Sequence, residues 1–91
     1  MSIGPRQRQG RELCVRLAEQ IALIAVPGIG RWDGAWEIVA DADIKFMISL
    51  LNWERTGDDD ALARVRTAYD RAINAWREAA RQYEEQGQKA S

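Results

Sequence analysis

The sequence predicts an all-α protein, an antiparallel three-helix bundle with coiled-coil-like packing. Helix-forming residues dominate it, and three segments carry apolar residues at alternating spacings of three and four. Short stretches that contain glycine separate these segments. We therefore expect helices over about 11–26, 34–54 and 59–86, inside a bundle that spans 11–87.

The composition limits the classes of function. A net charge of −1 argues against a protein whose main task is to neutralise phosphates. The chain has no His, the usual acid–base group near neutral pH, and a single Cys, Cys14, so a disulfide within the chain and a multi-cysteine zinc site are both excluded. This cysteine usage fits the cytoplasm. The longest apolar run, 21–26, is far shorter than the roughly 20 residues that span a bilayer, so we expect no membrane partner. No cofactor is expected either.

The N-terminal part predicts a flexible arm followed by the first helix. Residues 1–10 carry Arg6 and Arg8 among Gly, Pro, Ser and Gln, which indicates a basic arm, although Pro5 suits a first helical turn. The first helix then presents an apolar stripe that includes Cys14. We expect a buried thiol there, because no His or nearby Lys is available to activate it. The other members of the stripe are Leu17, Ile21 and Ile24.

The middle helix is the most apolar segment, and we expect the chain to fold around it. One stripe at helical spacing is predicted to face the core: Trp36, Val39, Phe46, Leu50 and Trp53. Asp43 lies in the same stripe and is predicted to be a buried polar residue. An unpaired buried carboxylate is costly, so it should accept a hydrogen bond from a donor at its level: Arg16, Gln20, Tyr69 or Trp76. We interpret Asp43 as a residue that fixes register, because no second titratable group shares its stripe.

The third helix follows a short turn at Gly57. Asp58, Asp59 and Asp60 lie where its first turn begins, and we expect one of them to cap the helix and the others to stabilise its positive end. A hard cation is the alternative, but the spacing lacks the alternating ligands of a calcium loop, so no metal site is expected. Gly87 is predicted to end the helix, before a polar tail over 88–91.

The short turn also sets which residues of the second and third helices lie at the same level. Counting away from Gly57 places Phe46 near Tyr69 and Val39 near Trp76.

A glycine-rich turn joins the first two helices. Pro27 and Gly28 should stop the first helix, and Asp33 is positioned to cap the second. The segment 26–30, VPGIG, followed by Gly34 and an apolar residue four positions later, resembles the helix-hairpin-helix DNA-binding motif. The resemblance implies contacts from Gly28, Gly30 and Arg31 to a DNA phosphate. The other interpretation is that Pro and Gly serve only the geometry of the turn.

Two further features suggest contact surfaces. Trp32 is a large apolar residue in a turn of small ones, so it either covers the end of the bundle near Tyr83 and Trp76 or anchors a partner. The middle helix is apolar over too wide an arc for two neighbours to cover. Its second stripe, Ile44, Ile48 and Leu51, is predicted to contact another chain, and a symmetric homodimer is the commonest arrangement. A wide contact with the third helix would cover all of this stripe except Ile48.

These observations favour a small non-enzymatic helical interaction module, such as an adaptor, an inhibitor or an assembly subunit, that acts through protein–protein contacts. The sequence contains no nucleophile–base pair, metal cluster or nucleotide loop that would favour an enzyme. A DNA-binding module that uses the VPGIG turn is the alternative.

Overall fold

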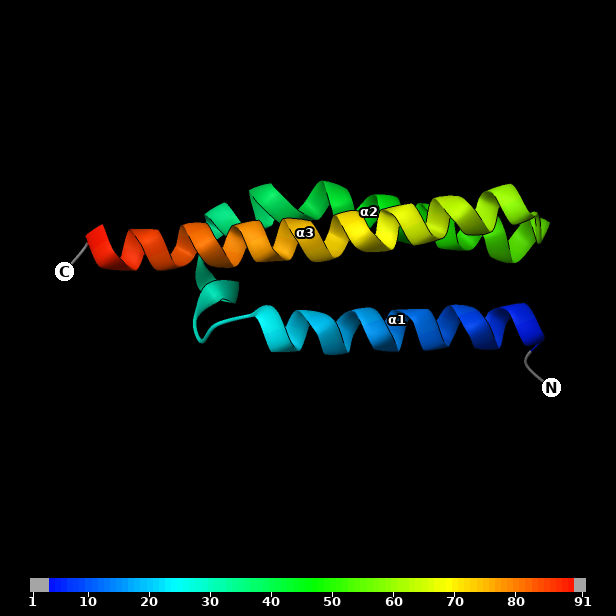
Figure 1. Ribbon diagram of the computed structural model, residues 1–91, viewed down its shortest axis with the longest axis horizontal. Helices are drawn as coiled ribbons and strands as arrows, with labels where there is room; N and C mark the ends of the chain where they lie inside the picture. The colour runs from blue at the N-terminus through cyan, green and yellow to red at the C-terminus, as the bar shows by residue number, and fades with distance from the viewer. Residues whose placement is uncertain (1–3, 90–91) are drawn as a thin grey trace.

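The structure, a computed structural model, describes residues 4–89 and contains three long helices in antiparallel order (Figure 1). They are α1 (Pro5–Ile24), α2 (Asp33–Thr56) and α3 (Asp59–Lys89), and a short 3₁₀ helix, η1 (Ile29–Arg31), precedes α2. No strand occurs among the described residues. The predicted all-α three-helix bundle is therefore confirmed.

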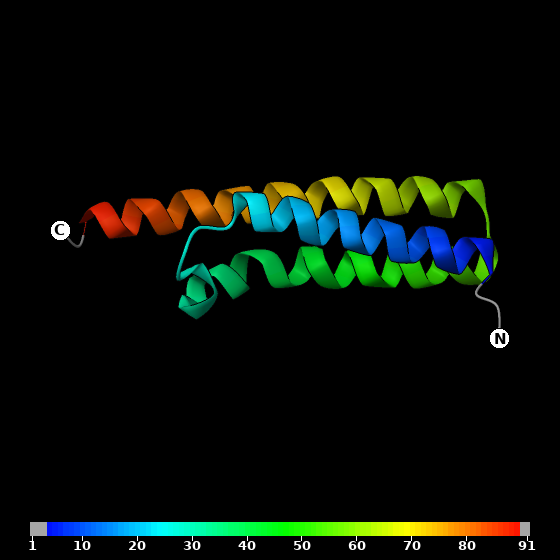
Figure 2. The same ribbon diagram turned by 90° about the horizontal axis from the view of Figure 1, so that it is seen from below.

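Helices α2 and α3 form the close pair, and α1 lies along one side of this pair and contacts both helices (Figures 1 and 2). Large side chains of α2, namely Phe46, Leu50 and Trp53, are buried in this pair. The buried residues that α3 contributes are mostly alanines, and small residues let two helix backbones approach closely. These alanines are Ala61, Ala68, Ala72, Ala79 and Ala80.

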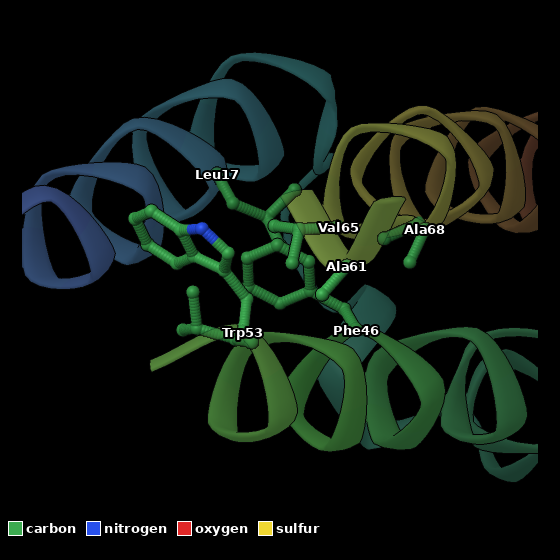
Figure 3. Close-up of a cluster of buried hydrophobic side chains, with 8 residues drawn as sticks. Leu17, Phe46, Trp53, Ala61, Val65 and Ala68 are labelled. Carbon is green, nitrogen blue, oxygen red and sulfur yellow. The ribbon is translucent and has the colours of Figure 1, made fainter. Parts of the chain in front are cut away.

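The core has two parts along the length of the bundle. One surrounds Leu17, Phe46 and Val65, which come from three different helices (Figure 3). The other lies at the end where η1 joins α2, and brings Ile29 and Val39 against Trp76. In α1 only Gly10 and Leu17 are buried, so α1 contributes much less to the core than the other two helices.

Helix α1 is longer at its start than predicted. It begins at Pro5, so residues 5–10 of the expected basic arm are helical, while 1–3 lie outside the described residues. Pro5 takes a first-turn position where a missing N–H costs nothing, and the Gly4 N–H donates to the Gln7 side-chain oxygen at 3.1 Å. Gly10 lies within this helix without interrupting it. It is buried against α2, where the carboxyl group of Glu54 occupies the space that a Cβ would take.

The first helix also ends earlier than predicted, at Ile24. Ala25 is extended, with φ −65° and ψ 132°, and Val26 belongs to no helix. The residue before a proline avoids helical geometry because of a clash with the proline ring, so Val26 is unsuited to a further helical turn.

The boundaries of the other two helices differ from the prediction by a few residues. Asp33 is the first residue of α2 rather than its cap, a position that Trp32 takes. Gly57 ends α2 in the left-handed conformation, with φ 71°, as a helix C-terminus commonly requires. The prediction that Gly87 ends α3 is wrong, because its φ is negative and the helix continues to Lys89. The first residues of the expected tail are therefore helical, and residues 90–91 lie outside the described part.

The core stripe of α2 was predicted correctly except at its first position. Trp36 is 51% exposed, and Ala35 takes the buried position beside Val39. The indole N–H of Trp36 donates to the Gly30 carbonyl at 3.2 Å, and its ring meets the edge of Trp76 at a centroid distance of 6.3 Å. Trp36 thus covers the end of the bundle from outside, where its N–H keeps a partner.

The predicted levels of α2 against α3 are confirmed. Phe46 meets Tyr69 edge-on at a centroid distance of 6.1 Å, and Val39 packs in the same cluster as Trp76. The alignment follows from the short turn at Gly57, whose N–H donates to the Trp53 carbonyl at 2.7 Å.

Truncation of Phe46 should be strongly destabilising, because this side chain is 2% exposed and lies where all three helices meet. We expect Phe46→Ala to lower the free energy of unfolding by about 3–5 kcal/mol, measured by chemical denaturation. Leu23→Ala is the control, since Leu23 is 81% exposed. The control should change stability by less than about 0.5 kcal/mol, and equal losses in the two variants would contradict the described core.

Candidate interaction surface on helix α2

Three large apolar side chains form a row on the side of α2 that faces away from the core. Ile44, Ile48 and Leu51 are 57%, 61% and 59% exposed. Their spacings of four and three place them on one face of the helix, opposite Phe46 and Leu50. We call this row the outer stripe. The wide contact with α3 that would have covered Ile44 and Leu51 is not formed.

Shallow grooves border the outer stripe on both sides. The first lies between α1 and α2, has a volume of about 280 Å³, and is lined mainly by apolar side chains. Its lining residues include Met47, which is 47% exposed and extends the outer stripe toward α1. The second lies between α2 and α3, has a volume of about 490 Å³, and has polar and charged residues in its lining, among them Lys45, Arg64 and Arg71. Apolar surface therefore continues from the outer stripe on both sides, and the side toward α1 carries fewer charged residues.

Asp43 lines the groove between α1 and α2 and is half-buried rather than fully buried. Of the four predicted donors, Trp76 is the one that contacts it: the indole N–H donates to Asp43 Oδ1 at 3.3 Å. Burial raises the pKa of the Asp43 carboxyl group, and the hydrogen bond from Trp76 lowers it, with a raised pKa as the net result. The contact joins α2 to α3 across the core and agrees with a role in fixing their register.

Cys14 lines the same groove and is half-buried. Burial raises the pKa of its thiol, and the negative charge of Glu54 raises it further. A thiol with a raised pKa stays protonated at neutral pH and is a poor nucleophile. This agrees with the interpretation of Cys14 as a packing residue.

The VPGIG turn forms a compact link between α1 and α2. Gly28 has φ 89°, which favours glycine, and a Cβ there would lie 2.6 Å from the Tyr83 hydroxyl oxygen. The N–H groups of Ile29 and Arg31 donate to the carbonyls of Val26 and Gly28, so two donors near the predicted phosphate site already have partners. Gly30 and Arg31 are exposed.

Trp32 packs at the end of the bundle. Its ring lies 5.8 Å from that of Tyr83, and a Cβ on Gly34 would meet it at 2.5 Å. Trp32 is half-buried in the cluster around Ile29, the first of the two predicted arrangements. The structure therefore brings together three of the four residues predicted for a partner interface and places Trp32 inside the bundle end.

Sequence reasoning missed two members of this surface. Met47 was not assigned to the second stripe, although its spacing of three from Ile44 and four from Leu51 is the signal that would have found it. The basic lining of the groove between α2 and α3 was missed because Lys45 and Arg64 come from different helices, and only the register of the pair places them together.

Within residues 4–89, no group of three or more potential ligands among His, Cys, Asp and Glu side chains is arranged to hold a metal ion. None of the described helices combines the length and the hydropathy needed to cross a membrane. Comparisons with protein-family models, curated proteins and solved structures give no match to this chain. A functional assignment therefore depends on the surface described above.

The raised pKa of Asp43 predicts a pH-dependent change in stability. Because the pKa is higher in the folded chain than its ordinary value of 3.8, ionisation costs stability as the pH rises from that value through the folded pKa. We expect Asp43→Asn, whose amide oxygen still accepts from Trp76, to be slightly more stable than the native protein at neutral pH. The difference should vanish below the ordinary value of 3.8.

Thermal unfolding followed by circular dichroism across this pH range measures the effect. Asp41→Asn is the control, because its carboxylate is exposed and pairs with Lys45 at 2.9 Å. A variant Asp43→Asn that is less stable at neutral pH would show instead that the ionised carboxylate stabilises the contact with Trp76.

Proposed function

We propose that this protein is a small non-enzymatic helical interaction module, which binds a protein partner through the outer stripe of α2. The observation that carries the proposal is the row of Ile44, Ile48 and Leu51, each more than half exposed, on a helix whose other side is fully packed. A single exposed isoleucine needs no explanation. Several large apolar residues in one row expose a contiguous patch, which is typical of a contact surface.

The way α2 is held supports this use of its outer side. Val39, Phe46 and Leu50 fix the helix against α3, so the outer stripe is presented on a rigid element. A preorganised surface loses little conformational entropy when a partner binds. Met47 and the groove toward α1 add further apolar area along the same side.

The titratable groups described above support a non-enzymatic role. Asp43 faces an indole N–H rather than a second acid or base, and the raised pKa of Cys14 disfavours a thiolate. A cytoplasmic setting belongs to the same proposal, since a single half-buried thiol suits a reducing compartment.

Contact with DNA by the VPGIG turn is the alternative proposal. Its support is the resemblance to the helix-hairpin-helix motif, together with the exposure of Gly30 and Arg31. Two observations weigh against it: the N–H groups of Ile29 and Arg31 already donate within the turn, and Asp33 places a carboxylate in the first turn of α2.

The interaction proposal is tested by placing a charge in the centre of the outer stripe. We expect Ile48→Glu to abolish capture of a protein partner from an extract of the native host, while circular dichroism remains helical. Leu23→Glu is the matched control, because it introduces the same charge at an apolar position that is even more exposed, on α1. Capture that survives Ile48→Glu, or is lost equally in the control, would contradict a role for the outer stripe.

The DNA alternative predicts binding to duplex DNA that weakens steeply as salt rises, because phosphate contacts release counterions. Arg31→Ala should then reduce binding measured by fluorescence anisotropy at low salt, and Arg77→Ala, an exposed arginine on α3, should not. The absence of binding by the native protein at low salt would rule this alternative out.

A further inference from the structure

We propose that the partner of the outer stripe is a second copy of this chain, bound so that the two α2 helices lie antiparallel across a two-fold axis at the level of Phe46. This inference rests on the proposed function, because it names the occupant of the same surface. It follows from the order of charged and apolar residues along the exposed side of α2.

The outer stripe ends in opposite charges. Glu37 precedes Ile44, Arg55 follows Leu51, and both charged side chains are exposed. The two residues are equidistant from Phe46 in the sequence and are separated by about five full turns at 3.6 residues per turn, so they lie on the same line along the helix. This line runs down the side of α2 opposite Phe46.

The two isoleucines of the outer stripe are placed symmetrically about the same line. Ile44 and Ile48 lie about 20° to either side of it, at roughly 100° per residue, and are also equidistant from Phe46. A two-fold axis at this level therefore sets Ile44 of one copy at the height of Ile48 of the other. The four isoleucines meet at the centre of the contact, and the two Leu51 side chains extend it along one edge.

The same operation brings opposite charges together at both ends. Glu37 of one copy lies at the height of Arg55 of the other, and the pair occurs twice. Parallel helices would instead place Glu37 against Glu37 and Arg55 against Arg55, and like charges at an interface are strongly unfavourable. The charges therefore select the antiparallel arrangement, while the apolar residues supply most of the stability.

The groups involved are available for these contacts. Arg55 donates one N–H to Asn52 at 3.2 Å and retains further donors for a carboxylate. Asp41, which would lie at the edge opposite Leu51, already pairs with Lys45 at 2.9 Å, so its charge remains compensated at the border of the contact.

Charge exchange between the ends tests the arrangement. We expect the native protein to be a dimer by multi-angle light scattering. Glu37→Arg and Arg55→Glu should each weaken self-association by roughly tenfold or more, because each places two like-charge pairs in the dimer. An equimolar mixture of the two variants should recover the dimer, since every end pair in the mixed dimer is attractive. The double variant Glu37→Arg/Arg55→Glu should recover it as well.

Helical content by circular dichroism confirms that each variant is folded, and Arg77→Glu, on the exposed side of α3, is the control for the change of charge. Single variants that associate like the native protein, or a mixture that fails to recover the dimer, would overturn the antiparallel pairing.

A native protein that remains monomeric at its highest soluble concentration would overturn self-association altogether. The proposed function is judged separately by partner capture with Ile48→Glu. If capture depends on Ile48 while the native protein is monomeric, the outer stripe is an interaction surface with a different occupant. If capture does not depend on Ile48 either, both proposals fail.

Discussion

The close packing of α2 against α3 is the contact on which the rest of the structure depends. Large residues of α2, such as Phe46 and Trp53, fill the space that the alanines of α3 leave free. Val65 and Ala72 of α3 are completely buried in this contact. This division of large and small residues allows the two helices to approach closely, and it fixes their register together with the short turn at Gly57.

The same packing accounts for the two features that bear on function. Trp76 reaches Asp43 because the register of the pair brings residues from distant parts of the chain to one level, which gives the half-buried carboxylate a donor. The outer stripe is exposed because α3 takes one side of α2 and α1 lies along one side of this pair. A bundle of three helices leaves the far side of each helix to solvent or to another molecule, and on α2 this side is apolar.

Much of the fold was predictable, because spacings of three and four are a direct consequence of helical geometry. The number and order of the helices and the pairing of Phe46 with Tyr69 follow from these spacings and from one short turn. The spacings left four candidate donors for Asp43, and the structure shows that Trp76 is the one in contact. The spacing alone was less reliable in predicting which side chains are buried. Ala35 and Trp36 both fit the spacing to Val39, and size favoured the tryptophan, but the limited space beside α3 admits the alanine.

The role of each glycine could not be predicted from its residue type alone. Gly57 ends a helix, whereas Gly10 and Gly87 lie within one. The exposed outer stripe was predicted from the width of the apolar arc on α2. Its groove toward α1 was not, because that groove depends on how far α1 lies from α2, which no local pattern of residues encodes.

Helix α1 is attached by few buried side chains, and this has a consequence for how the protein opens. Leu17 is its one large buried residue, whereas Leu23 and Val15 point outward. Local opening costs less free energy where fewer apolar contacts must be broken. Amide protons of α1 should therefore exchange with solvent sooner than those of α2 and α3, which makes the α2–α3 hairpin the slowest-exchanging unit of the chain. Detachment of α1 would briefly expose the side of that hairpin that α1 contacts, and this open form is the one that proteases would recognise first.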